Sequence, residues 1–210
     1  MDINKIHNEC CLKAIKKISN NKFDLAIVDP PYGYGNKKTN ILNFRQKDQH
    51  RDWNVAPNKD YFNELFRVSK NQIIWGGNYF SYIWNFGGRC FIYWHKGNPV
   101  NNFADGELAW TSFDKNAKQF NYRYYGNLEG NTSTSKKFHP TQKPVKLYEW
   151  LLMNYAKDGD KILDTHLGSG SIAIACHNLG YDLTGYEIDK EYYDNAIKRI
   201  KRHQSQTRLF

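Results

Sequence analysis

The last third of the chain has the most regular pattern of apolar and polar positions. Apolar residues at helical spacing follow Pro144, and a short apolar run over 161–163 predicts a strand. A glycine-containing turn then leads to an apolar helix over 172–179, a strand over 182–188 and a closing helix over about 191–202. A strand, a helix and a strand within this length form a βαβ unit, so the pattern predicts a parallel sheet.

The first half predicts shorter elements separated by polar stretches. Residues 10–18 have helical apolar spacing, and the apolar run over 23–28 predicts a buried strand that ends before Asp29. Further elements are predicted as a helix over 60–68, strands over 72–75, 89–94 and 107–113, and a short helix ending near Gly87 and Gly88. The polar segments 33–59 and 114–139 have no apolar period and predict loops.

Length and composition favour one α/β domain over residues 1–210, because 210 residues with 40% hydrophobic content suit a single core. No apolar run approaches a membrane span, and the first residues lack an apolar signal segment, so we expect a cytoplasmic protein without membrane contact. The cysteines have no paired metal-ligand spacing, which favours free thiols and no metal ion (Cys10, Cys11, Cys90 and Cys176).

The formal net charge of +9 changes this picture only in part. A basic surface attracts phosphate groups, which is typical of nucleic-acid binding. An AT-rich genome would also raise the lysine content without any nucleic-acid partner. The charge alone therefore leaves both interpretations open.

A glycine-rich turn lies between the strand over 161–163 and the following helix. It runs from Asp164 to Ser171 and contains Gly168 and Gly170, which let a ligand approach the backbone closely. Glu187 ends the next strand about 20 residues later, where an acidic side chain can accept both hydroxyls of a ribose. The pattern predicts a nucleoside-containing cofactor, although a tight turn in an α/β protein with another ligand is the alternative. A nicotinamide cofactor is disfavoured because the G-x-G-x-x-G pattern is absent.

The second unusual turn, Asp29-Pro30-Pro31-Tyr32, follows the buried strand over 23–28. Tandem prolines stiffen the backbone and leave carbonyl acceptors without N–H donors. Asp29 and the Pro30 carbonyl can accept two N–H bonds from the amino group of a planar base, and Tyr32 can stack on its ring. A strand end with a proline turn and an incidental tyrosine is the structural alternative. The combination of residue types favours a site for an aromatic amine.

These two motifs together resemble the beta group of DNA amino-methyltransferases, in their N6-adenine type, where the target-base motif precedes the cofactor loop. The segment His139-Pro-Thr-Gln-Lys-Pro144 is similar to the family segment that contacts the methionine part of the cofactor. The resemblance covers about residues 4–201. It implies a Rossmann-like α/β methyltransferase fold, with a doubly wound, mostly parallel sheet and a small inserted recognition region. It also implies S-adenosylmethionine as methyl donor and a base flipped out of the DNA duplex.

The resemblance assigns roles to individual residues. The catalytic set is Asp29, Pro30, Pro31 and Tyr32. The cofactor-binding set is Cys10, Asp29, His139, Thr141, Lys143, Asp164, His166, Gly168, Ser169, Gly170 and Glu187. Two positions depart from the family. The family loop usually reads D-P-F-x-G-S-G, but this chain has Thr165 and His166 in place of the Pro and the Phe. Cys10 stands where the family often has an aspartate that faces the cofactor adenine.

Two polar segments remain for DNA. We expect 33–59 to be a mobile loop that closes over the target base and 98–138 to be a small target-recognition region. Their cationic side chains are candidate DNA contacts, namely Lys37, Lys38, Arg45, Arg51, Lys115, Lys118, Arg123 and Lys136. Solvated surface loops are the alternative, and the better one for any single lysine.

The preferred hypothesis is methylation of adenine N6 in double-stranded DNA by a bacterial or phage-encoded enzyme. N4-cytosine enzymes share the architecture but more often carry serine in place of Asp29. Enzymes acting on RNA or on protein glutamine typically carry Asn-Pro-Pro-Tyr after the cofactor loop. A non-catalytic DNA-binding homologue is a further alternative. A homodimer is expected only by analogy with relatives.

Overall fold

The computed structural model describes residues 4–33, 55–97, 104–125, 128–129, 132–133, 139 and 142–206. Six predicted site residues lie outside these ranges: Lys37, Lys38, Arg45, Arg51, Lys136 and Thr141. The same holds for most of the predicted target-base loop. All four cysteines are described, and all four are free thiols.

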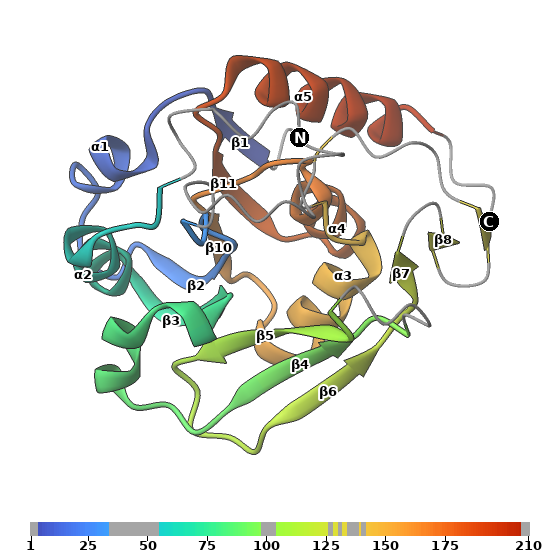
Figure 1. Ribbon diagram of the computed structural model, residues 1–210. Coiled ribbons are helices and arrows are strands. Elements are labelled where there is room, and N and C mark those ends of the chain that lie inside the picture. The colour runs from blue at the N-terminus through green and yellow to red at the C-terminus, as the bar shows by residue number, and fades with distance from the viewer. Residues whose placement is uncertain are drawn as a thin grey trace.

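An eight-stranded sheet forms the centre of the fold (Figure 1). Its strands are β1 (Asn4–His7), β2 (Phe23–Val28), β3 (Ser69–Trp75), β4 (Phe91–His95), β5 (Gly106–Thr111), β6 (Lys118–Asn121), β10 (Lys161–Asp164) and β11 (Asp182–Tyr186). The spatial order is β1-β11-β10-β2-β3-β5-β4-β6. Neighbouring strands are parallel except where β5 pairs with β3 and β4. The predicted doubly wound, mostly parallel sheet is confirmed.

Helices cover both faces of the sheet. One side has α1 (Cys11–Ile15), α2 (Lys59–Val68) and the 3-10 helices η2 (Gly77–Tyr79) and η3 (Ser81–Phe86); the other has α3 (Val145–Tyr155), α4 (Ser171–Leu179) and α5 (Lys190–Gln204). In β2, Leu25 and Ile27 join the core beneath α3 and α4, whereas Ala26 and Val28 join the core beneath α1 and α2. This burial on both faces explains the continuous apolar run. No helix in the described ranges is long and apolar enough to cross a membrane.

Some elements differ from the predictions. The structure adds β1, a four-residue edge strand in which only Asn4 is buried, so it has no apolar pattern. The segment 114–139 was predicted to be a loop, but it contains β6 and a small antiparallel sheet of β7 (Tyr124–Tyr125), β8 (Leu128–Glu129) and β9 (Thr132–Ser133). Strands of two residues are too short to show a period of two.

The segment 98–138, predicted as an inserted region, contributes β5 and β6 to the main sheet. Only the remainder of that segment is available as a separate recognition region, and its role in DNA recognition stays a prediction. The antiparallel direction of β5 also matters for the site. Its first residues, Gly106 and Glu107, lie at the edge where the parallel strands β2 and β3 end.

Candidate active site

Three acidic side chains meet where the sheet changes winding direction. Asp29 follows β2, Asp164 ends β10, and Glu187 follows β11. The strands β2 and β10 are adjacent, and the chain proceeds outward from them in opposite directions (Figure 1). Ligands of doubly wound sheets bind beyond the carboxyl ends of the strands at such a point. The structure therefore brings together the two turns that the sequence singled out.

Tyr32 is held beside Asp29 by a direct hydrogen bond. Its hydroxyl donates to Asp29 Oδ1 at 2.7 Å, and its ring lies 4.9 Å from the ring of Tyr79, which is 47% exposed. Burial, and then the charge of Asp29, raises the pKa of Tyr32 well above its ordinary value, so the hydroxyl stays neutral. The site thus has a carboxylate, Asp29, beside a pair of aromatic rings, Tyr32 and Tyr79.

Glycine at position 76 makes room for the Tyr32 ring. Gly76 follows β3 with a φ of +67°, and a Cβ atom there would lie 2.1 Å from Tyr32 Cε1. In the sequence, Gly76 only follows the strand predicted over 72–75. The structure shows that its missing side chain sets the position of a predicted catalytic residue.

Lys143 directly precedes Pro144 and α3, and its side chain, which extends into the site, is only 3% exposed. Its Nζ forms an ion pair with Asp29 Oδ2 and lies 3.1 Å from Glu107 Oε2. Burial lowers the pKa of Lys143, but the charges of Asp29 and Glu107 outweigh it and raise the pKa above its ordinary value. Lys143 was predicted at the carboxylate end of the cofactor. The structure directs its ammonium group to Asp29 and Glu107.

The glycine loop is tied to Glu187 and packed against His139. The Gly168 N–H donates to Glu187 Oε2 at 2.9 Å. A Cβ atom on Gly168, whose φ is +52°, would lie 3.1 Å from the His139 ring, and that ring lies 4.4 Å from the Tyr192 ring. The predicted cofactor residues Gly168, His139 and Glu187 are therefore neighbours.

Arg199 holds this loop from the far side, and sequence reasoning missed it. Its guanidinium donates to the Ser169 carbonyl at 2.9 Å and to Ser171 Oγ at 2.8 Å. Ser171 Oγ in turn donates to the Lys143 carbonyl at 2.7 Å. Arg199 lies among polar residues of α5, where the sequence pattern is the same for an arginine that binds a loop and for one that faces solvent.

Asp164 is buried between the other two carboxylates. Burial, followed by the charges of Asp29 and Glu187, raises its pKa to about 8, although it accepts a hydrogen bond from the His166 N–H. Burial also raises the pKa of Glu187. Acidic groups with raised pKa values favour a positively charged ligand, because a cation stabilises their ionised forms.

Thr165 and His166, the two residues that depart from the family loop, contact polar side chains of α1 and α2. Thr165 Oγ1 lies 2.6 Å from the Tyr61 hydroxyl and 2.9 Å from His166 Nδ1, and His166 Nε2 lies 4.0 Å from Cys11 Sγ. Burial lowers the pKa of His166 to about 4, so the imidazole is neutral. Cys10 itself is half-buried and precedes α1, next to this cluster.

Restoring the family residues with Thr165→Pro and His166→Phe is expected to destabilise the protein by about 1–3 kcal/mol, because the buried Tyr61 hydroxyl would lose its partner. Adding Tyr61→Phe should recover most of that loss. Thermal unfolding of the double and triple variants measures both effects. Equal stability of the double variant and the unchanged protein would contradict the pairing.

The described DNA-contact candidates do not share one edge. Arg123 follows β6 and lies at the carboxyl edge of the sheet with the site. Lys118 begins β6, and Lys115 lies over the rings of Phe113 and Tyr155, at 5.2 and 5.3 Å from their centroids. Both lysines therefore lie at the opposite edge. Among the described candidates, only Arg123 is brought to the side of the site, and DNA contact by any of them stays a prediction.

Two curated proteins are similar over most of the chain. The type II methyltransferase M.HpaI of Haemophilus parainfluenzae is 26% identical, with 90% of this chain and 71% of the relative covered. The type II methyltransferase M.HinfI of Haemophilus influenzae is 28% identical, with 95% and 68% covered.

Solved structures are similar in fold. The crystal structure of an M1.HpyAVI–SAM complex aligns with a TM-score of 0.62 and 26% identity over 93% of this chain and 99% of that one. The PvuII DNA methyltransferase, described as cytosine-N4-specific, aligns with a TM-score of 0.57 over 95% of this chain and 90% of that one, but at 13% identity it supports the fold alone.

A family model described as DNA methylase matches residues 76–198, which is more than half of the chain. The match begins at Gly76 and includes the glycine loop and Glu187. It confirms the predicted relationship to methyltransferases that act on DNA. The chain therefore belongs to the DNA methylase family.

Proposed function

We propose that this DNA methylase transfers a methyl group from S-adenosylmethionine to N6 of an adenine flipped out of double-stranded DNA. The observation that carries the proposal is the adjacency of two sites at the β2–β10 junction. The Asp29–Tyr32 turn lies on one strand, and Asp164 with the glycine loop lies on the next. Cofactor and target amine would then meet beyond the ends of neighbouring strands.

The residues around the glycine loop fit the cofactor. S-adenosylmethionine supplies an electrophilic methyl group on a positively charged sulfur. Asp164 and Glu187 have raised pKa values, and a bound cation would favour the ionised form of both carboxyl groups. Glu187 also retains lone pairs that can accept hydrogen bonds from ribose hydroxyls. Gly168 and Gly170 have φ values of +52° and +73°, which glycine adopts without strain, and these set the path of the loop whose backbone would face the methionine portion. The similar M1.HpyAVI structure contains SAM, which supports the assignment.

Asp29 would orient the target amine. Its two carboxylate oxygens accept from Tyr32 and Lys143, and each oxygen has a second lone pair for an N–H of the base. Accepting that bond, together with the Pro30 carbonyl, favours a more tetrahedral nitrogen whose lone pair faces the methyl group. As the methyl carbon bonds to this nitrogen its bond to sulfur breaks, which leaves a neutral thioether, and the nitrogen loses one proton that Asp29 would receive. Positioning and electrostatics would supply most of the acceleration.

Adenine is favoured over cytosine because the first residue of the turn is Asp29 and not serine. The proposal is tested by incubating the protein with unmethylated duplex DNA and labelled S-adenosylmethionine, then identifying the labelled nucleoside. N6-methyl-2′-deoxyadenosine is expected. N4-methyl-2′-deoxycytidine would overturn the assignment of the base, and unlabelled DNA would favour the non-catalytic alternative. Sedimentation of the same sample with and without DNA tests the expected homodimer.

Ionisation of Asp164 gives this cofactor site a testable pH dependence. Because the pKa of Asp164 is about 8 and a cation favours the carboxylate, the affinity for S-adenosylmethionine should rise between pH 6.5 and 8.5, by up to about tenfold per pH unit. S-adenosylhomocysteine has the same amino and carboxyl groups but an uncharged sulfur, so its affinity should rise less. Calorimetric titration of both ligands measures the difference. Parallel profiles for the two ligands would contradict the role of Asp164.

Asp164→Asn supplies the matching control on stability. Folding raises the pKa of Asp164, so its contribution favours the folded state at low pH and is lost as the pH rises towards 8. The asparagine variant should therefore unfold at a higher temperature than the unchanged protein at pH 8.5 without cofactor. It should also lose the pH dependence of cofactor binding. A lower unfolding temperature at pH 8.5 would contradict the raised pKa.

A further inference from the structure

We propose that Glu107 is a positioning residue for methyl transfer, which acts on Asp29 through Lys143. Four charged side chains alternate in sign along one path through the site: Asp29, Lys143, Glu107 and Lys96. They come from four separate parts of the chain: Asp29 follows β2, Lys96 follows β4, Glu107 lies at the beginning of β5, and Lys143 lies just before α3. The inference rests on the proposed function only in taking Asp29 as the acceptor of the target amine.

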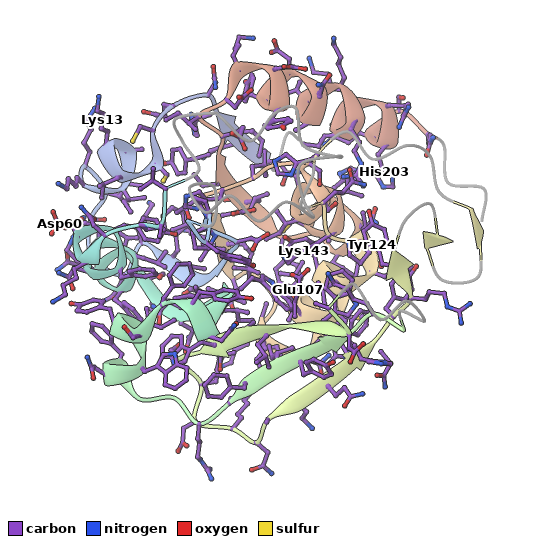
Figure 2. All side chains as sticks on the ribbon, viewed as in Figure 1. Lys13, Asp60, Glu107, Tyr124, Lys143 and His203 are labelled. Carbon is purple, nitrogen blue, oxygen red and sulfur yellow. The ribbon has the colours of Figure 1, made fainter. Side chains whose placement is uncertain are left out.

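The topology explains why Glu107 can reach a catalytic group. The strand β5 is antiparallel to β3, so its second residue lies at the edge where β2 and β3 end. The side chain of Glu107 divides its two oxygens between two lysines. Oε1 pairs with Lys96, and Oε2 lies 3.1 Å from Lys143 Nζ. Figure 2 shows Glu107 and Lys143 together near the centre of the molecule.

Tryptophan rings fix both cations. Lys143 Nζ lies 5.3 Å from the centroid of the Trp75 ring, and Lys96 Nζ lies 4.9 Å from that of Trp94. Trp75 and Trp94 are fully buried and pack edge to face. Cation–π attraction and burial leave Lys143 little freedom to move away from the carboxylates. The position of its ammonium group is therefore set by Asp29 on one side and Glu107 on the other.

Charge sharing is the physical basis of the proposed role. Burial would raise the pKa of Glu107, but the charges of Lys143 and Lys96 outweigh it and lower the pKa to about 2, so Glu107 is ionised. In the described part of the chain, Lys143 has ion pairs only with Asp29 and Glu107. Glu107 thereby holds the Lys143 ammonium group between the two carboxylates, so Lys143 neutralises Asp29 less than it would in a pair with Asp29 alone. Asp29 keeps more of its negative charge for the N–H of the target amine.

Removing the charge of Glu107 should slow chemistry without weakening binding. In Glu107→Gln, Lys143 would bind Asp29 alone and shift toward it, which makes Asp29 a poorer acceptor. We expect kcat to fall about 10- to 100-fold, since small displacements at a reacting centre have effects of that size. The KM for S-adenosylmethionine should stay within about twofold, and Glu107→Asp should recover part of the rate because it restores the charge.

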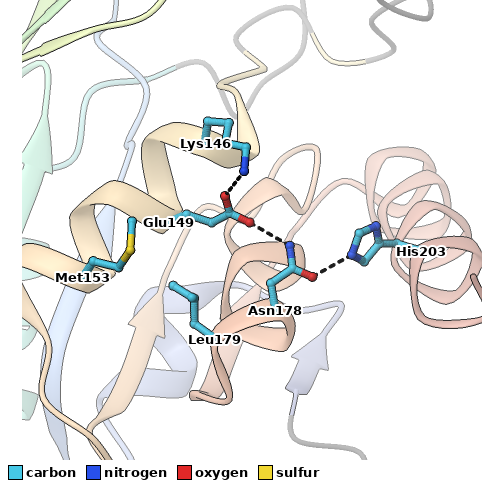
Figure 3. Close-up of a pocket in the computed structure, with 6 residues that line it drawn as sticks. All are labelled: Lys146, Glu149, Met153, Asn178, Leu179 and His203. Atoms are coloured by element: carbon cyan, nitrogen blue, oxygen red, sulfur yellow. Dashed lines mark hydrogen bonds and ion pairs between the residues drawn. The ribbon is translucent and has the colours of Figure 1, made fainter. Parts of the chain in front are cut away.

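Glu149 provides a matched control. It is a carboxylate of α3 with 12% side-chain exposure, and its Oε2 and Oε1 lie 2.8 Å from Lys146 Nζ and Asn178 Nδ2. Figure 3 shows it in a pocket between the helices, where Asn178 also contacts His203. Glu149→Gln neutralises a partly buried carboxylate away from the strand ends. Its kcat should equal that of the unchanged protein.

A double-mutant cycle separates the positioning role from a structural one. Lys143→Met removes the side chain that holds the Asp29 carboxylate in place and leaves two carboxylates that repel each other, so it should lose more rate than Glu107→Gln. Adding Glu107→Gln to Lys143→Met removes the repulsion between the carboxylates, so the double variant should be no slower than Lys143→Met. Two losses that multiply, or an unchanged kcat for Glu107→Gln, would overturn the proposal.

The readout is the rate of labelled methyl transfer to duplex DNA, measured at varied cofactor concentration so that kcat and KM are both obtained. The label is counted whichever base receives it. A wrong assignment of the base would therefore appear in the labelled nucleoside and would leave the comparison among variants valid. Melting temperatures of all variants confirm that each one is folded under the assay conditions.

Discussion

Asp29→Ala is expected to lose methyl transfer by about 100- to 1,000-fold at saturating cofactor, because the target amine would lose the acceptor that orients it. The fold should tolerate the change. Lys143 would still pair with Glu107, which keeps its charge balanced. Single-turnover transfer of labelled methyl to duplex DNA measures the loss, and a calorimetric titration shows whether the cofactor still binds.

Asp24→Ala is the matched control for this variant. Asp24 belongs to the same strand, β2, but lies at its beginning, where it accepts from Lys70 Nζ at 2.7 Å and from the Lys161 N–H at 2.9 Å. Its removal should leave the transfer rate unchanged. Near-normal turnover of Asp29→Ala would rule out the proposed orientation of the amine by this carboxylate.

Gly76→Ala should give the second large loss, about 10- to 100-fold in kcat, because the new methyl group would collide with the Tyr32 ring and displace it from Asp29. The backbone strain of an alanine at φ +67° adds roughly 1–2 kcal/mol of destabilisation. The transfer rate and the unfolding temperature are measured on the same sample.

Gly180→Ala separates the collision from the strain. Gly180 follows α4 and has nearly the same left-handed conformation as Gly76, with φ +79° and ψ 25° against φ +67° and ψ 22°, but a Cβ atom there would have no heavy atom within 4 Å. Both variants should lose similar stability, whereas only Gly76→Ala should lose activity. If Gly180→Ala also lost activity to the same extent, strain in the backbone would account for the result and the role of Tyr32 would not be supported.

The βαβ unit over 161–200 could be predicted because α4 is apolar and α5 is amphipathic, so their periods are strong. The Asp29–Tyr32 turn and the glycine loop could also be predicted, since proline pairs and glycines directly after apolar strands are uncommon. The edge strand β1 and the two-residue strands β7, β8 and β9 lack enough residues to show a period.

Glu107, Arg199 and the true partners of Lys143 could not be predicted. A charged residue on a short strand or a polar helix face has the same local pattern whether it is solvated or paired. Arg199 contacts Ser169 across 30 positions, and Lys143 contacts Asp29 across 114. Such pairs depend on how β5, α5 and the 139–144 segment pack, which no local period encodes.

The family departures at Thr165 and His166 show the same limit. From the sequence alone they stand out only as departures from the family loop. In the fold, Tyr61 and Cys11 contact these side chains, so the substitutions form part of a packed, hydrogen-bonded cluster.

Methylation of the genome in a bacterial host without DNA methyltransferases of its own tests the central claim most directly. The unchanged protein and Asp29→Ala are expressed at equal levels, and modified bases are mapped by single-molecule sequencing. We expect N6-methyladenine at one fixed position of a short sequence with the unchanged protein, and none with Asp29→Ala. Modified cytosine, or no modified base at equal expression, would contradict the proposed function.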